Sequence, residues 1–168
     1  MSQVVSKSLL FLALAGASSA VMAADNAKAP SPSTFVTKAA QTGMAEVELG
    51  KIALSKSQDP EVRSFAQRMV EDHGKANKEL ASIAKAQGIE TPKRLDAKHL
   101  AMVEELKLMT GDEFDRKYAH HMNSGHSDAI ELFEQESRSG DAALAGFAQK
   151  TLPTLKEHKQ LAEKLPGH

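Results

Sequence analysis

The sequence predicts an all-α protein, a four-helix bundle with a short extra helix in the connection between its two helical hairpins. From Phe35 onward, apolar residues recur at helical spacing almost throughout the chain. The same stretch has no alternating run of β-branched residues and no Asn-Gly or Asp-Gly turn, the usual signals of strands and β-hairpins. Capping and stop signals divide it into five helical segments. Short turns join the first two long helices and the last two, which predicts two antiparallel hairpins.

Particular residues mark the ends of these helices. Asp59, followed by proline, begins the second helix, and Gly88 ends it. Thr110 opens a capping box, and Gly140, followed by aspartate, separates the last two helices. Pro153 lies inside the last helix and should kink it. We therefore expect helices over residues 35–57, 60–87, 97–109, 111–139 and 142–165.

The composition excludes several classes of function. The 168 residues include 21 Lys and Arg against 22 Asp and Glu, a formal net charge of −1, which argues against general nucleic-acid binding. The chain has no Trp and one Tyr, so aromatic platforms for stacking bases are nearly absent. It has no Cys, which excludes disulfides, thiolate metal sites and cysteine nucleophiles.

The N-terminal segment is typical of a secretory signal peptide. Lys7 precedes an apolar run over residues 8–23 that ends in small residues. The run is shorter than the roughly 20 residues that a membrane-spanning helix needs. We expect cleavage after Ala23 and a periplasmic or secreted location. The expected organisation is a signal peptide over 1–23, a disordered leader over 24–34 and a four-helix bundle domain over 35–165.

Each long helix places one titratable side chain on its apolar face: Glu46, His73, His126 and His158. Counted from the hairpin turns, the two members of each hairpin lie at similar heights, with a mismatch of roughly 4–6 Å at 1.5 Å per residue. Groups that meet inside a bundle should pair or hold a metal, because an isolated buried charge is costly.

Two interpretations of this cluster stay open. In one, the four side chains form a hydrogen-bonded network without metal. In the other, three imidazoles and a carboxylate bind one ion of zinc, copper(II), iron(II), nickel or manganese. A di-iron site is disfavoured because it needs a glutamate three residues before the histidine on two helices. The residues at that offset are Val70, Asn123 and Leu155.

Two methionines lie four residues before inward histidines, Met69 before His73 and Met122 before His126. Thioether and imidazole together could bind copper(I), although methionine is also a common filler of helical cores.

Two glycines, Gly43 and Gly50, lie on the inner face of the first helix. Each costs about 1 kcal/mol relative to alanine inside a helix. Their position indicates that another backbone approaches closely there.

Several segments carry a resemblance to a known family. They lie at residues 43–51, 65–70, 111–115 and 147–158, together with Asp72, His73 and His126. The chain resembles domain-of-unknown-function family 4142 over roughly residues 35–165. The resemblance implies an exported bacterial protein with a ferritin-like four-helix bundle, no established activity, and motifs that carry the four inward residues. Many members have aspartate before the third of these residues, where this chain has Gly125, which argues against an orienting role for that position. Members are often labelled outer-membrane proteins, and we expect at most a peripheral association with the envelope.

The sequence therefore predicts a ferritin-like exported bundle that binds one metal ion, in a stress-related or binding role, through Glu46, His73, His126 and His158. The alternative is a metal-free structural or partner-binding module. No Gly-x-Ser-x-Gly elbow, phosphate-binding glycine loop or His-Glu-x-x-His helix is present, so we expect a binding protein rather than an enzyme.

Overall fold

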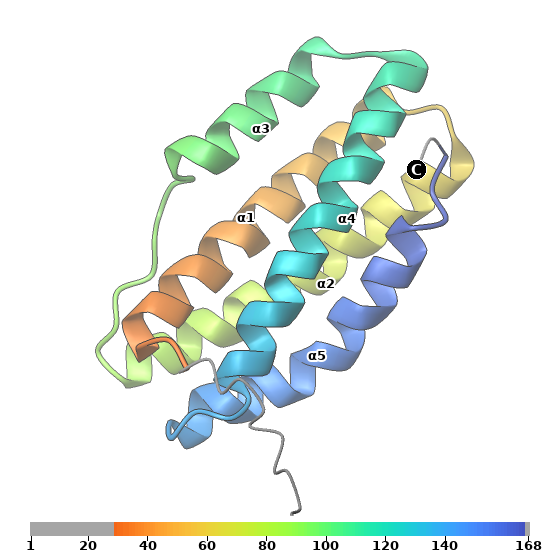
Figure 1. The fold of residues 1–168 in the computed structure, drawn as a ribbon. Coiled ribbons are helices and arrows are strands. Elements are labelled where there is room, and N and C mark those ends of the chain that lie inside the picture. Colours follow the sequence, from red (N-terminus) through yellow and green to blue (C-terminus); the bar gives the residue numbers. More distant parts are fainter. Residues whose placement is uncertain (1–28, 167–168) are drawn as a thin grey trace, which may run out of the picture.

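The computed structural model describes residues 29–166, which form five α-helices (Figure 1). The described part of the chain contains no strand, and the all-α prediction is confirmed. The predicted signal peptide over 1–23 lies outside the described residues, as does the predicted leader up to residue 28. The helices are α1 (Pro32–Lys56), α2 (Pro60–Ala86), α3 (Ala97–Leu108), α4 (Gly111–Glu136) and α5 (Ala142–Ala162).

Two helical hairpins make up the bundle. Helices α1 and α2 form the first and α4 and α5 the second, and they pack so that α1 contacts α4 and α2 contacts α5. Helix α3 belongs to the connection between the hairpins and lies along the outside of α1 and α4 (Figure 1). Helix α5 contains Pro153 and bends along its length. Among the described residues, no helix combines the length and the apolar character needed to cross a bilayer.

The helix starts follow the predicted signals with two differences, and α4 and α5 each end three residues earlier than expected, at Glu136 and Ala162 rather than at 139 and 165. Helix α1 begins at Pro32, so residues 32–34, which we assigned to a disordered leader, form its first turn. The reason is local, because the Ser31 side chain accepts a bond from the Thr34 backbone and proline suits the first helical position. Thr110 is the N-cap of α4, but its side chain makes no capping bond, and Gly111 next to it has a φ of 60° rather than a helical value.

Gly50 allows helices α1 and α2 to approach closely. A Cβ atom at this position would lie 3.0 Å from the Ala66 carbonyl oxygen and 2.9 Å from Val70 Cγ2. The expectation of a close backbone is thus confirmed at Gly50. At Gly43 the neighbour is instead the side chain of Asn77, whose Oδ1 would lie 2.1 Å from the added Cβ.

The apolar core has two halves. One half is centred on aromatic residues Phe65, Phe114 and Tyr118, and the other on Phe35, Phe133 and Phe147. On every long helix, the predicted inward residue falls between the segments that build the two halves. The four polar side chains thus form a layer across the middle of the bundle.

Candidate metal centre

The structure brings together all four residues that the sequence singled out. Glu46, His73, His126 and His158 are each buried, with 3, 7, 0 and 1 % of their surface exposed. Each comes from a different helix of the bundle, so the site depends on the packing of both hairpins. His126 is more deeply buried than the sequence indicated, since its helical position lies towards one flank of the apolar face.

The three imidazoles surround one point. The centroids of their rings are separated by 5.3 to 5.5 Å. One nitrogen from each ring lies within 4.8 Å of one nitrogen from each of the others. Phe65 presses its ring edge-on against His126 and His158, with centroids 6.4 Å away in both cases, and excludes water from that side.

The outward bonds of two histidines fix where their protons lie. His126 Nδ1 donates to the Met122 carbonyl oxygen at 2.7 Å, and His158 Nε2 donates to Asp72 Oδ2 at 3.0 Å. A carbonyl or carboxylate oxygen can only accept, so the proton of each neutral ring is on the outward nitrogen. The inward nitrogens, His126 Nε2 and His158 Nδ1, therefore present lone pairs to each other across 3.4 Å.

Glu46 completes the cluster from α1. Its Oε2 lies 2.9 Å from His73 Nε2, and its Oε1 lies 3.4 Å from His126 Nδ1. Charge attraction and the short contact to His73 hold the carboxylate beside the imidazoles.

The charges in the cluster are set by competition between burial and the neighbours. Burial raises the pKa of Glu46, but the three imidazoles outweigh it and bring that pKa down to about 2. Burial lowers the pKa of His73, yet the Glu46 carboxylate overrides it and raises that pKa above its usual value.

The other two histidines are shifted in the opposite direction. Burial lowers the pKa of His126, and burial together with the charge of His73 lowers the pKa of His158 to about 4. These shifts favour a charged Glu46 carboxylate, make His73 the imidazole that holds a proton most readily, and favour neutral rings at His126 and His158.

The donor set fits a divalent transition metal. With bonds of about 2.1 Å, tetrahedral ligand atoms lie roughly 3.4 Å apart, which matches the 3.4 Å between the inward nitrogens of His126 and His158. Ligating histidines usually donate their other N–H to a carboxylate or a backbone carbonyl, as both of these do. His73 adds a third nitrogen to this group, and the Glu46 carboxylate lies beside it, against His73 Nε2 and His126 Nδ1.

Sequence reasoning missed Asp72 as a member of the site. Its side chain is one-third exposed, and its neighbour in the chain, His73, points inward. The signal was its position beside His73, because a residue at the edge of an inner face can reach the adjacent helix. Met69 and Met122 pack within the apolar core. His121 lies outside the cluster and bonds to Glu105.

The fold and the site together define a class: a helical bundle whose apolar core is divided by a buried cluster of three histidines. The chain matches, over residues 17–165, the family described as a domain of unknown function, DUF4142. It belongs to that family, as the sequence resemblance indicated. No curated protein matches the chain.

Two solved structures are similar in fold. A DUF305 fragment from Deinococcus radiodurans has a TM-score of 0.70 and 16% identity, over 81% of this chain and 95% of that one. CopM in its Cu(II)-bound form has a TM-score of 0.67 and 14% identity, over 79% of this chain and 93% of that one. At these identities the likeness shows a shared helical-bundle fold.

Proposed function

We propose that this protein binds one transition-metal ion in the central layer of its bundle, through His73, His126 and His158 with Glu46 as the oxygen ligand. Copper(II) is the preferred ion. Three imidazoles and a carboxylate suit copper(II) and zinc, and also iron(II) and manganese(II). Among divalent ions of this row, nitrogen and oxygen sites favour copper(II) most.

One observation carries the proposal: two neutral imidazoles direct lone pairs at each other across 3.4 Å in a buried site. Without a positive charge between them, these nitrogens repel each other and neither has a donor. A proton could bridge them, but the lowered pKa values of both rings oppose it. A metal ion between the two nitrogens satisfies both.

The fold similarity supports copper in particular. CopM, a bundle of similar fold, is described in a Cu(II)-bound form. This chain has no Cys, so copper would be bound here by imidazole and carboxylate without a thiolate.

We further propose that the protein works outside the cytoplasm, as the predicted signal peptide over 1–23 indicates, in binding or buffering metal in the cell envelope. A binding role fits the site better than catalysis does. The protein offers four donor side chains from four packed helices, which would occupy four coordination positions of the ion.

The test is a calorimetric titration of protein purified without chelator, with copper(II) and with zinc. We expect one ion per chain for the wild type and loss of that binding in the His126→Gln/His158→Gln variant. His120→Gln changes an exposed residue of α4, the helix that carries His126, and should bind copper(II) and zinc as the wild type does. No heat of binding with either metal, from protein that also carries none after purification, would contradict the proposal.

The metal-free module is the second candidate, favoured by the 2.9 Å approach of Glu46 to His73, which could fix the register of α1 against α2. It predicts that His73→Ala lowers the melting temperature equally with and without added metal. The metal-binding proposal predicts that His73→Ala lowers the melting temperature more when metal is present than when it is absent, because a ligand stabilises only the folded state that binds it.

A further inference from the structure

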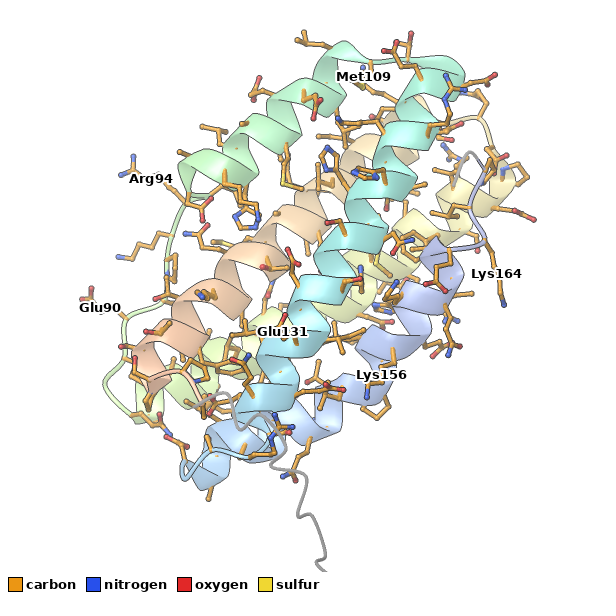
Figure 2. All side chains as sticks on the ribbon, in the orientation of Figure 1. Glu90, Arg94, Met109, Glu131, Lys156 and Lys164 are labelled. Carbon is orange, nitrogen blue, oxygen red and sulfur yellow. The ribbon has the colours of Figure 1, made fainter. Side chains whose placement is uncertain are left out.

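A groove leads from the surface of the bundle to the central cluster. It has a volume of about 670 Å³ and runs between α1, α3 and α4, with Glu131 of α4, labelled in Figure 2, among its lining residues. Glu46 also lines it, although only 3 % of that residue is exposed. The groove therefore reaches the carboxylate that lies against His73 and His126.

Gly125 leaves the end of this groove open. It lies in the middle of α4, one residue before His126, and lines the groove. A Cβ atom at this position would have a single close neighbour, Glu46 Oε1 at 3.5 Å. Glycine is a poor helix former, and every other residue type would place side-chain atoms over the Glu46 carboxylate. Because Gly125 has no side chain, nothing from this position of α4 covers Glu46 Oε1, although that oxygen is itself buried.

The chemistry of the groove suits a metal cation. Four carboxylates line it against two ammonium groups, and those carboxylates belong to Glu46, Asp96, Asp128 and Glu131. Two histidines and two methionines outside the central cluster also line it: His99, His121, Met102 and Met122. Such a negative concave surface raises the local concentration of cations.

The opposite face of the molecule offers a poorer approach. A polar hollow of about 430 Å³ there is lined by Asp72, Arg68 and Glu157 among others. Asp72 is the member of the site that lines this hollow, and the Arg68 guanidinium in it forms an ion pair with Glu157. Asp72 in turn occupies the outward nitrogen of His158. A cation on this side would meet, beyond Asp72, a His158 nitrogen that already carries a proton.

We propose that the metal ion enters and leaves the centre through the groove between α1, α3 and α4, passing Gly125 and meeting Glu46 Oε1 before it reaches the histidines. This route rests on the proposed function, because it concerns how the same site is filled.

The first test blocks the route and measures rates. Association of copper(II) with the purified protein is followed by stopped-flow fluorescence quenching, and dissociation by transfer to a chelator. In Gly125→Leu we expect both rates to fall at least about tenfold while the dissociation constant stays within about threefold, since a blocked path changes kinetics and not the bound state. Gly146→Leu is the matched control, because Gly146 is an exposed helical glycine with open space around it.

The second test changes the charge of the groove at exposed positions, where folding is not at risk. We expect Asp128→Lys/Glu131→Lys to slow association at low salt, by about tenfold or more, and to weaken its dependence on ionic strength. Glu71→Lys/Glu90→Lys makes the same change in net charge away from the groove, with Glu71 on the rim of the opposite hollow. That control should leave the rate within about twofold of the wild type.

The outcomes separate the route from the function. Failure of the wild type to bind copper at equilibrium would overturn both proposals. Normal binding with unchanged association rates in Gly125→Leu and in the groove charge variant would overturn the route alone. If Gly125→Leu binds copper(II) more weakly but associates at the wild-type rate, Gly125 shapes the binding site and not the path to it. That result would also overturn the route.

Discussion

Proton positions on individual histidines carry the argument for a metal. His126 and His158 each turn one nitrogen to an acceptor outside the cluster, the Met122 carbonyl and the Asp72 carboxylate. Those two bonds leave the inward nitrogens without protons. Sequence periodicity predicts that the side chains point inward, but it cannot predict which ring nitrogen finds an acceptor, since that depends on distances between helices.

Asp72 should tune the affinity for metal without being a ligand. We expect Asp72→Asn to weaken copper binding about 10- to 100-fold, because the amide no longer fixes the proton on His158 Nε2 or raises the basicity of the ring. Equilibrium competition with a calibrated chelator measures the change. Glu71→Gln, an exposed neighbour on the same helix, is the control, and an Asp72→Asn affinity equal to that of the control would contradict the assignment.

Metal binding should release protons at neutral pH. The raised pKa of His73 means that this ring favours its protonated form beside Glu46, and a metal must displace that proton to bind the nitrogen. Affinity should therefore rise as the pH rises through the pKa of His73. It should be lost towards pH 4, where His158 also takes up a proton.

Calorimetric titrations in buffers of different ionisation enthalpy count the released protons. His73→Gln should remove the release that occurs near neutral pH. Binding enthalpies that are the same in all buffers, with an affinity that does not change with pH, would show that His73 binds no proton before the metal arrives.

At the scale of helices, the packing of α1 on α2 sets the height of Glu46 relative to His73. We expect Gly50→Ala to lower the free energy of unfolding by about 1–3 kcal/mol, because the added methyl group overlaps a backbone carbonyl that cannot move aside. Gly146→Ala, on the exposed face of α5, should instead be neutral or stabilise by up to about 1 kcal/mol. Urea unfolding of both variants measures the difference, and equal stability would rule out a close approach at Gly50.

The helices could be predicted from the sequence because their end signals are local. Asp59 and Asp141 cap the helices that they were expected to cap, and Asp96 caps α3 in the same way, through bonds to residues two or three positions ahead. The start of α1 was harder, since Pro32 is compatible both with a disordered leader and with a first helical turn. At Thr110 the sequence predicted a capping box, but the threonine side chain makes no capping hydrogen bond, and the next residue, Gly111, has a positive φ.

At the scale of the molecule, the polar layer between two apolar core halves explains why the sequence revealed four inward residues. Each helix repeats the same order of apolar segment, titratable residue and apolar segment, and antiparallel packing brings the four titratable residues to one level. Asp72 and the groove beside Gly125 could not be predicted in this way. Both depend on how far apart neighbouring helices lie and on which side chains are missing between them.

Copper(II) bound to protein labelled with ¹⁵N-histidine, studied by electron paramagnetic resonance, tests the tri-histidine centre most directly. We expect coupling to three imidazole nitrogens in the wild type and in His120→Gln, and to fewer in His158→Gln. A spectrum of oxygen-coordinated copper, or one that His158→Gln leaves unchanged, would contradict a metal site at the centre of this bundle.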